Sequence, residues 1–269
     1  KTAQWSSETS QWTVHVERVG TGDIVTFTCG FLFMCSGYYR YSEGFTPEFP
    51  GRERFQGQII HPQKWTSDVA YSGKRVVVVG SGATAITLVP AMAKDAKHVT
   101  MLQRSPTYIA ARPDVDAFAN ALRKYLPSKI AYAMTRLKNT KYQQLVYSRS
   151  RTHPDKVKEI LLKGVREQLG PDYDIEKDFT PTYNPWDQRL CLAPNGDFFQ
   201  AMRDGKASVV TDTIDTFDET GIVLSSGEHL DADVIVTATG LQLVTLGEVQ
   251  FEVDGKPFNF ADTWTYKGV

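Results

Sequence analysis

The chain has 269 residues, of which 41% are hydrophobic and 23% charged, and its formal net charge is −1. This composition is ordinary for a soluble globular protein, and the balanced charge excludes an overall attraction to nucleic acid or to a membrane surface. No apolar run reaches the ~20 residues of a membrane span, so stable membrane insertion is also excluded.

The ends of the chain indicate a fragment. The first residue is Lys1 rather than Met, and no recognisable terminal element precedes Val269. We therefore expect a piece of a longer protein, in which the lack of a signal peptide carries little weight.

The three cysteines, Cys29, Cys35 and Cys191, form neither a disulfide framework nor a metal-ligand cluster. Cys29 and Cys35 are too far apart along an extended strand to be bridged. We expect all three to be small buried apolar residues in a reducing compartment, which indicates a cytoplasmic protein without a metal site.

The first predicted elements are those of a β-meander. Residues 12–19 alternate between apolar and polar side chains, residues 24–28 return as a second strand, and residues 31–34 form a more apolar strand that ends in small residues and glycine. The same order recurs from residue 208, where residues 208–217 are predicted as one strand and VIVTATG later matches FLFMCSG in pattern. Two meanders that each lead into a buried strand predict two related nucleotide-binding domains. Residues 41–57, rich in glycine, proline and aromatic side chains, are typical of a connection between domains.

The sequence KRVVVVGSGATA, residues 74–85, organises the second of these domains. Its four consecutive valines predict a strand that is buried on both faces of a parallel sheet. Gly80, Gly82 and Ala85 have the GxGxxA spacing of a dinucleotide-binding turn, because the first glycine permits the turn, the second admits a pyrophosphate and the alanine allows close helix packing. The following helix, which we expect to end near Ala93, directs its first N–H groups at the ligand's negative charge.

Residues 98–103 are predicted as the next strand of the same unit, and Arg104 and Ser105 follow it. NAD-binding proteins usually have Asp or Glu at this point to hold the adenosine ribose, whereas an arginine binds a 2′-phosphate. The sequence therefore favours NADPH over NADH. The alternative is an arginine that is merely exposed at the end of a strand.

A helical region follows. Residues 116–138 and 154–169 have the apolar spacing of helices, with Pro127 as a break and Gly170 as a stop. We interpret the many Lys and Arg residues of this region as a solvated face, since no nucleic-acid recognition motif accompanies them. Residues 179–197 contain two proline turns that carry Tyr or Trp, and they are predicted as an ordered loop.

A second motif precedes the valine strand. Phe55, Gly57, His61 and Trp65 have the spacing FxGxxxHxxxW. By composition alone, such a histidine is more often a structural hydrogen-bonding group than a catalyst. With this spacing, directly before a nucleotide-binding strand, the motif resembles the fingerprint of the type I Baeyer–Villiger monooxygenases, which are relatives of the flavin-containing monooxygenases.

The resemblance extends through essentially the whole chain. The segments CSGYY, IIHPQ, GSGATA, LQRSPTY, YNPWDQRLC and VTATG are similar to those of the ethionamide-activating branch of this family. It implies an α/β fold with two Rossmann-like, three-layer domains, each a parallel sheet with a β-meander, in which the NADPH domain is inserted in the FAD domain. We expect a partial FAD domain and linker at residues 1–70, an NADPH domain at 71–238 with a helical insertion at about 113–180, and a return to the FAD domain at 239–269. The FAD glycine loop would lie upstream of Lys1.

The resemblance also implies the site residues, with Arg189 and His61 as candidate catalytic residues. Many family members precede the active-site arginine with a lysine that contacts the 2′-phosphate, whereas this chain has Gln188, which leaves Arg104 with more of the discrimination. For His61 we favour holding the domain junction in register over proton transfer, because no acid or base partner is identifiable beside it. The residues implied to bind NADPH are Gly80, Ser81, Gly82, Ala83, Thr84, Ala85, Ile86, Arg104 and Ser105.

The implied activity is that of an FAD- and NADPH-dependent monooxygenase. NADPH reduces the flavin, which captures O2 as a C4a-peroxide and oxygenates a small molecule. A ketone gives an ester or lactone, and a sulfide or thioamide gives an S-oxide. Arg189 is expected to stabilise the negative charge of the peroxide.

Two alternatives stay open. One is a truncated NADP-binding module without activity, because the FAD glycine loop and the C-terminal substrate region are expected to lie outside the chain. The other is a relative of the pyridine nucleotide-disulfide reductases, which need a redox-active cysteine pair, typically CxxxxC. Cys29 and Cys35 have a different spacing, which disfavours this alternative.

Overall fold

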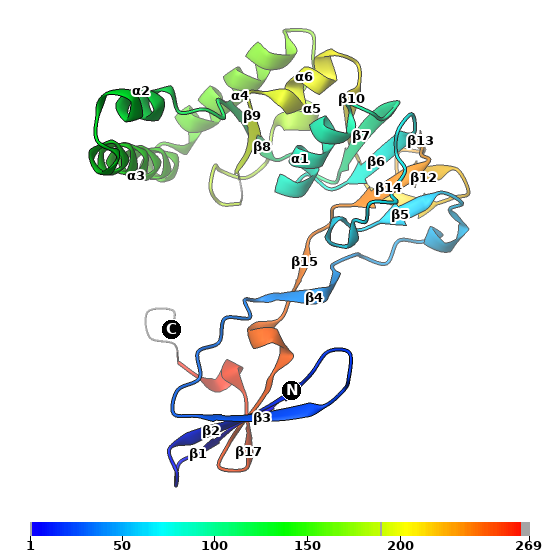
Figure 1. The fold of residues 1–269 in the computed structure, drawn as a ribbon. Coiled ribbons are helices and arrows are strands. Elements are labelled where there is room, and N and C mark those ends of the chain that lie inside the picture. The colour runs from blue at the N-terminus through cyan, green and yellow to red at the C-terminus, as the bar shows by residue number, and fades with distance from the viewer. Residues whose placement is uncertain (1, 189, 265–269) are drawn as a thin grey trace. The chain divides into compact units, whose positions relative to one another are not determined.

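The computed structural model describes residues 2–188 and 190–264, which divide into two compact units (Figure 1). The first unit comprises the described residues up to Gly44 and from Leu241 onward, and the second runs from Phe45 to Gly240. The chain therefore passes between the units twice. Residues 45–70 lie in the same unit as the glycine turn, and the naming of the units as FAD and NADPH domains stays a prediction.

The first unit is built on a five-stranded sheet in the order β17-β16-β1-β2-β3. β1 lies parallel to β16, and the other neighbours are antiparallel. Trp5 and Trp12 are paired across β1 and β2 with ring centroids 5.4 Å apart, and Trp12 meets Phe251 edge to face. A separate antiparallel pair joins β4 to β15. The strands of this unit are β1 (Thr2–Ser6), β2 (Gln11–Glu17), β3 (Ile24–Cys29), β4 (Tyr39–Gly44), β15 (Leu241–Leu243), β16 (Gln250–Val253) and β17 (Lys256–Phe258).

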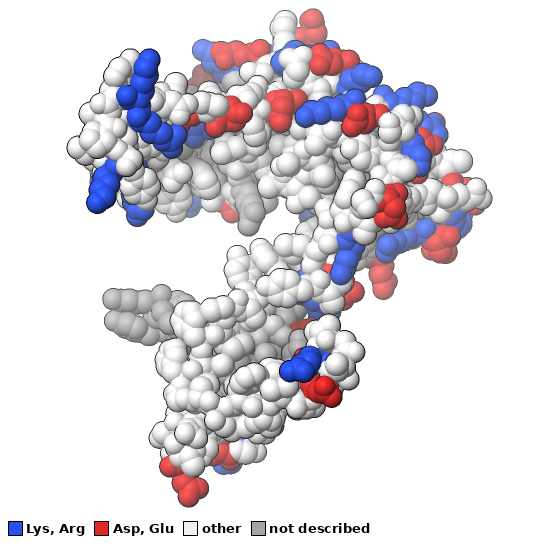
Figure 2. Space-filling model, viewed as in Figure 1, with Lys and Arg blue, Asp and Glu red and all other residues white. Residues whose placement is uncertain are grey.

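The strand predicted at residues 31–34 is wrong. These residues have no regular secondary structure, and Phe31 and Phe33 are 78% and 75% exposed. A buried strand needs neighbours that pair with its N–H and C=O groups. None of the strands described in the first unit lies along this segment. On the face shown in Figure 2, the first unit carries few charged side chains.

The second unit is built on a parallel sheet in the order β10-β7-β6-β14-β5, with the valine strand in the middle. Residues 208–217, predicted as one strand, are two strands: β10 joins this sheet, and β11 turns away into an antiparallel meander with β12 and β13. The strands are β5 (Gln58–Ile60), β6 (Arg75–Val79), β7 (His98–Gln103), β10 (Ala207–Thr211), β11 (Ile214–Phe217), β12 (Gly221–Leu224), β13 (His229–Asp231) and β14 (Val234–Thr237). Short 3-10 turns, Arg52–Arg54 and Pro62–Lys64, flank β5.

The side chains of the valine strand alternate between two apolar cores. Val76 and Val78 belong to a core shared with α1 (Ala83–Met92) and α6 (Asp197–Arg203), whereas Val77 and Val79 belong to a core shared with the meander. Both faces of the sheet are covered, which explains why the strand is apolar at every position. These three layers of helices, parallel sheet and meander confirm the predicted α/β fold class (Figure 1).

A helical insertion lies between β8 (Tyr108–Arg112) and β9 (Leu190–Pro194). Asp116 caps the first helix by accepting a hydrogen bond from Ala119 N, and the second helix begins after Pro127, as predicted. The second helix continues to Thr152 instead of ending near residue 138, because most of its polar side chains stay in solvent and do not interrupt it. The buried Ser150 hydroxyl donates a hydrogen bond to Val146 O within the helix. The helices are α2 (Ala117–Tyr125), α3 (Ser128–Thr152), α4 (Pro154–Leu169) and α5 (Ile175–Phe179).

The segment predicted as an ordered loop, residues 179–197, contains a strand. β9 (Leu190–Pro194) pairs in parallel with β8 (Tyr108–Arg112). Each of these two strands has a single described neighbour, so neither is a central strand, and β9 ends in proline. The long apolar run that is typical of a central strand is therefore missing from both.

Two further expectations concern single residues and membrane insertion. All three cysteines are free, but only Cys191 is buried, whereas Cys29 is half-buried and Cys35 is exposed.

Among the residues that the structure describes, no helix combines the length and the apolar character needed to cross a bilayer.

Candidate functional site

The glycine turn lies at the carboxyl end of β6. At this strand the connections of the sheet change direction, because the chain continues to one side of β6 first and to the other side later. β7, the next strand of this sheet along the chain, lies on one side of β6, and β14, which comes much later, lies on the other. Open parallel sheets bind their ligands in the crevice at such a switch point. The turn therefore lies at the position where this class of fold admits a ligand.

Gly80 has a backbone conformation that favours glycine. Its φ is +127°, and a Cβ atom at this position would lie 2.4 Å from the carbonyl oxygen of Ala238, in the segment after β14. Its N–H donates a hydrogen bond to Leu102 O over 2.8 Å. The turn is held against both neighbouring strands, so any larger residue has to displace backbone atoms.

Gly82 precedes α1 in an ordinary conformation, with φ −77°, and nothing lies within 4 Å of the position that a Cβ atom would occupy. The first N–H groups of the helix have no intrahelical acceptor. Open space in front of such groups is what a pyrophosphate needs at a helix N-terminus. Ala85 and Ile86 are buried against the sheet, and Ile86 N already donates to Gly82 O, so these two residues support the helix from behind.

Arg104 and Ser105 follow β7, and both are exposed. The carbonyl oxygen of Ser105 accepts a hydrogen bond from Ser81 Oγ over 3.5 Å, which joins this segment to the glycine turn. Within the described chain, no carboxylate forms an ion pair with Arg104, so its guanidinium is available to an external anion. The two parts of the predicted NADPH site therefore lie at one edge of the sheet.

A buried polar network, which sequence reasoning missed, fixes the end of β7. Gln103 is 2% exposed, and its amide donates hydrogen bonds to Asp178 O (2.7 Å) and Thr211 Oγ1 (2.8 Å). Thr211 Oγ1 donates to Asp178 Oδ1 (2.7 Å), and the Tyr173 hydroxyl donates to Asp178 Oδ2 (2.9 Å). Burial, together with the Asp178 charge, raises the pKa of Tyr173, so this hydroxyl stays a donor. The only signal in the sequence was a polar residue at the end of an apolar strand.

The FxGxxxHxxxW segment runs along the edge of the sheet and includes β5. Phe55 is buried in the core on the meander side, and Trp65 packs against the core on the helix side. A Cβ atom at Gly57 would lie 2.5 Å from the carbonyl oxygen of Asp233, just before β14. The glycine therefore allows β5 to lie close to β14, and the spacing lets one short segment contact both faces of the sheet.

His61 contacts backbone groups at the other end of β14. Its Nε2 lies 2.9 Å from Gly240 O, and its Nδ1 accepts a hydrogen bond from Gln63 N over 3.2 Å. In the tautomer that suits both contacts, Nε2 donates to Gly240 O and Nδ1 accepts from Gln63 N. Gly240 O also accepts a hydrogen bond from Phe45 N (3.1 Å), so His61 lies where the second unit begins and ends. These contacts support the structural role that we favour over proton transfer.

The second candidate catalytic residue, Arg189, lies outside the described residues, and its assignment stays a prediction. Gln188 is exposed, and β9 begins at Leu190. Cys191 is buried with its Sγ 4.0 Å from Ser81 O, so β9 packs beside the glycine turn.

The turn before β9 is held by an ion pair between Arg151, near the end of α3, and Asp187. This pairing holds the pKa of the Asp187 carboxyl below its usual range. Asp187 Oδ2 also accepts a hydrogen bond from Asn184 N over 3.3 Å. The helical insertion is thereby connected directly to the segment that contains the predicted active-site arginine.

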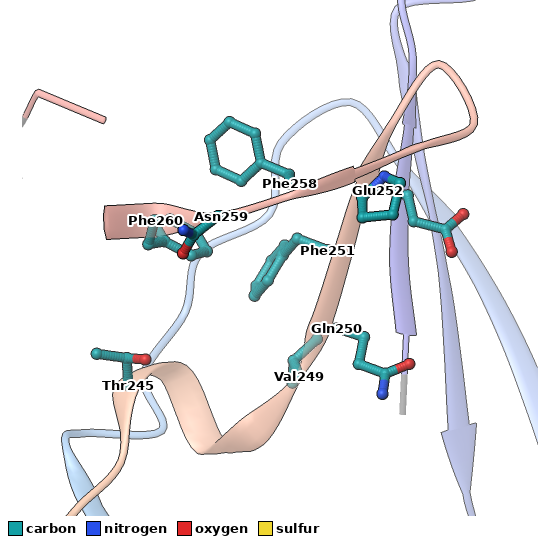
Figure 3. A pocket seen from close by; sticks show the side chains of 9 residues that line it. Thr245, Val249, Gln250, Phe251, Glu252, Phe258, Asn259 and Phe260 are labelled. Atoms are coloured by element: carbon teal, nitrogen blue, oxygen red, sulfur yellow. The ribbon is translucent and has the colours of Figure 1, made fainter. Parts of the chain in front are cut away.

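The first unit has a hollow of about 680 Å³ around β16 and β17 (Figure 3). Phe251, Phe258 and Phe260 line it, and the Phe260 ring meets the other two edge to face at 4.9 and 5.1 Å. Its charged lining residue, Glu252, accepts a hydrogen bond from Gln4. No Lys or Arg occurs among the described residues that line this hollow, so the lining does not suit a phosphate group.

Comparison with protein families decides the class of the protein. The model of the flavin-binding monooxygenase-like family matches residues 1–166. The chain belongs to this family. The resemblance that was inferred from the motifs is thereby confirmed.

Curated members of this monooxygenase group match almost the whole chain. The FAD-containing monooxygenase EthA of Mycobacterium tuberculosis (strain ATCC 25618 / H37Rv) is 52% identical over 268 residues, which are 99% of this chain and 54% of EthA. The probable FAD-binding monooxygenase AlmA of Acinetobacter baylyi (strain ATCC 33305 / BD413 / ADP1) is 48% identical over 268 residues, covering 99% of this chain and 53% of AlmA. The chain spans about half the length of the curated relatives that it matches.

Solved structures of monooxygenases have the same fold. An oxidized steroid monooxygenase bound to NADP has a TM-score of 0.70 at 26% identity, covering 93% of this chain and 53% of that chain. An open crystal structure of cyclohexanone monooxygenase has a TM-score of 0.71 at 17% identity, covering 97% of this chain and 57% of that chain. At the latter identity the likeness concerns the fold alone.

Proposed function

We propose that this chain is the NADPH-binding part, with a portion of the FAD-binding part, of a monooxygenase that uses both cofactors. The enzyme inserts one oxygen atom of O2 into a ketone, giving an ester or lactone, or transfers it to the sulfur of a sulfide or thioamide. The second unit is then the NADPH domain, and the first unit belongs to the FAD domain. Support comes from family membership, from relatives named for FAD, and from the NADP-bound steroid monooxygenase.

The observation that carries the NADPH assignment is the pairing of the glycine turn with Arg104. The two are joined through Ser81 and Ser105, and Gly82 leaves open space before α1. The donors at the N-terminus of α1 suit a pyrophosphate, and an exposed arginine suits a 2′-phosphate. NADH would leave Arg104 without its phosphate partner and find no carboxylate at that position for its ribose.

The cofactors supply the hydride and oxygen chemistry, and the residues of the chain bind, orient and shield them. In this proposal the N–H groups of Ala83 and Thr84 face the pyrophosphate, and Arg104 holds the 2′-phosphate. His61 keeps both ends of the second unit together through Gly240. Arg189 provides a fixed positive charge for the negative charge that develops during oxygen transfer.

Nucleotide titration of the purified chain tests the assignment. We expect NADPH to bind at least about tenfold more tightly than NADH, and Arg104→Ala to remove most of this preference without weakening NADH. Arg123→Ala is the matched control, because Arg123 is an exposed α2 residue hydrogen-bonded to Asn120, and it should leave both affinities unchanged. Equal affinities of the wild-type chain for the two nucleotides would refute the assignment.

Flavin absorbance separates the enzyme from the inactive module. Bound FAD with NADPH-dependent consumption of O2 supports a monooxygenase. A colourless chain that binds NADPH supports the inactive NADP-binding module instead.

A further inference from the structure

The second unit contains a cleft of about 860 Å³ that the nucleotide site does not use. It lies between the strand pair β8 and β9 on one side and the helices α3 and α4 on the other, and we call it the helical cleft. Its volume is within the range of sites that bind small organic molecules. All of the described residues that line it belong to the second unit.

The walls of the helical cleft are mostly apolar. Val146 and Tyr147 of α3, Leu161 of α4, and Leu190 and Leu192 of β9 line it. Leu192 and Tyr147 are 51% and 54% exposed, which is a large fraction for side chains of this size and type. Apolar and aromatic surface that remains open in a concave site is typical of a binding site for an apolar ligand group.

One arginine that lines the helical cleft forms no ion pair with any described residue. Arg112, at the end of β8, lies over the Tyr142 ring with its guanidinium carbon 4.7 Å from the ring centroid. The other two charged lining residues, Lys163 and Glu167, pair with each other at 3.9 Å. Within the described part of the chain, Arg112 has no ion pair, so the cleft has one uncompensated positive charge.

The helical cleft and the glycine turn share one wall. In β9, Cys191 and Ala193 point into the core, where Cys191 Sγ lies 4.0 Å from Ser81 O. The alternate residues, Leu190 and Leu192, line the cleft instead. Because successive side chains of a strand point to opposite faces, β9 separates the cleft from the nucleotide turn by the thickness of one strand.

We propose that the helical cleft binds an amphiphile, in which an aliphatic chain lies on the apolar walls and an anionic head group, such as a carboxylate, pairs with Arg112. Charge complementarity at Arg112 and the apolar lining carry this proposal. That this amphiphile is the molecule to be oxygenated rests on the proposed function. The binding itself requires no flavin, NADPH or O2.

Fluorescence titration of the chain with dodecanoate and with dodecan-1-ol, below their aggregation concentrations, tests the proposal. Trp186 lines the cleft, is 43% exposed and contacts the Tyr147 ring, so its emission should report occupancy. We expect dodecanoate to bind at least about tenfold more tightly than the uncharged alcohol. The fluorescence change should disappear in Trp186→Phe, which assigns the signal to this cleft among the five tryptophans of the chain.

Substitutions separate the head group from the chain. Arg112→Ala should weaken dodecanoate about tenfold without changing the affinity for dodecan-1-ol, and Arg112→Lys should restore part of the loss. Leu192→Ser should weaken both ligands by a similar factor. Arg123→Ala, outside the cleft, should bind both as the wild type does.

Three results would overturn the proposal: wild-type affinity for dodecanoate in Arg112→Ala, no binding of either ligand by the folded wild-type chain, or a stable dimer that dissociates in Leu192→Ser. The last result would assign the cleft to a second copy of the chain. Circular dichroism of each variant distinguishes lost binding from lost folding. Because NADPH titration is a separate measurement, failure here leaves the nucleotide assignment intact, and the reverse also holds.

Discussion

Gln103 donates a hydrogen bond from its side-chain amide to the backbone carbonyl oxygen of Asp178 over 2.7 Å, in a buried position. The two residues are 75 positions apart in the chain, at the end of β7 and in α5. Arg104 comes directly after Gln103. The helical insertion therefore holds the strand end from which the predicted phosphate-binding arginine extends.

Gln103→Leu should destabilise the second unit. It keeps a similar side-chain size but leaves Asp178 O and Thr211 Oγ1 without a donor, which costs about 1–3 kcal/mol. Urea unfolding measures this loss. Gln144→Leu, at an exposed position on α3, is the matched control and should change the unfolding free energy by less than about 0.5 kcal/mol. Equal stabilities of the two variants would show that the network contributes nothing.

Gly80→Ala and Gly82→Ala should have different effects. At Gly80 the new Cβ atom meets Ala238 O at 2.4 Å in a positive-φ conformation, so we expect lower thermal stability by about 1–3 kcal/mol and lost NADPH binding. At Gly82 the conformation is ordinary and the space is open, so stability should be retained while the methyl group hinders the pyrophosphate. Thermal melts and NADPH titrations of both variants measure this. A stable Gly82→Ala chain with wild-type NADPH affinity would contradict the placement of the pyrophosphate.

His61→Ala and His61→Asn separate the two hydrogen bonds of this histidine. Asparagine can still accept a hydrogen bond from Gln63 N but no longer reaches Gly240 O, whereas alanine can make neither bond. We expect destabilisation of about 0.5–1.5 kcal/mol for each hydrogen bond that is removed, so alanine should cost more than asparagine. Denaturant unfolding of the chain gives both values. Wild-type stability of His61→Ala, combined with lost activity in the full-length protein, would favour proton transfer over the structural role.

Arg189→Ala should separate oxygenation from NADPH oxidation in the full-length protein. Loss of a fixed charge at the site of oxygen transfer is expected to lower product formation by at least about 100-fold, while NADPH oxidation continues. The measurement is product yield per NADPH consumed. Unchanged product formation would remove Arg189 from the mechanism.

Gln188→Lys serves as a companion variant and should tighten NADPH binding, because it restores the lysine that many family members have there.

Asp218 should make the second unit acid-sensitive. Its carboxylate accepts hydrogen bonds from Thr220 N (2.8 Å), Gly221 N (2.9 Å) and His229 Nε2 (2.9 Å). The contacts with Thr220 and His229, the Thr220 backbone foremost, lower its pKa from 3.8 to about 2. Because the folded-state pKa is depressed, the stabilisation is present above about pH 4 and is lost as the pH falls toward 2.

Asp218→Asn should therefore lower the free energy of unfolding by about 1 kcal/mol at neutral pH and flatten its fall between about pH 4 and 2. Urea unfolding across this pH range checks both effects. Asp215→Asn, at an exposed position on the neighbouring strand β11, is the control and should follow the wild-type pH profile. A parallel fall in both variants would attribute the acid sensitivity to other carboxylates.

Predictions from sequence succeeded where the cause of a structure is local. Residues 98–103 and 154–169 are elements with the bounds that their periodicity indicated. Residues 31–34 failed for the opposite reason, since an apolar run becomes a strand only when neighbours pair with it, and none of the described strands does so. β9 was missed because its pairing with β8 depends on a segment about 80 residues away, which no local pattern reveals.

Three features could be predicted from the sequence itself. A turn with a positive φ favours glycine, a strand buried on both faces favours consecutive valines, and a phosphate ligand favours an arginine after β7. Tertiary structure alone decided which strands are neighbours, that Gln103 meets Asp178, and that His61 meets Gly240 across 179 positions. It also created the helical cleft, whose walls come from four separate elements. Such contacts depend on the packing of whole elements, because the residues involved have no pattern in common along the chain.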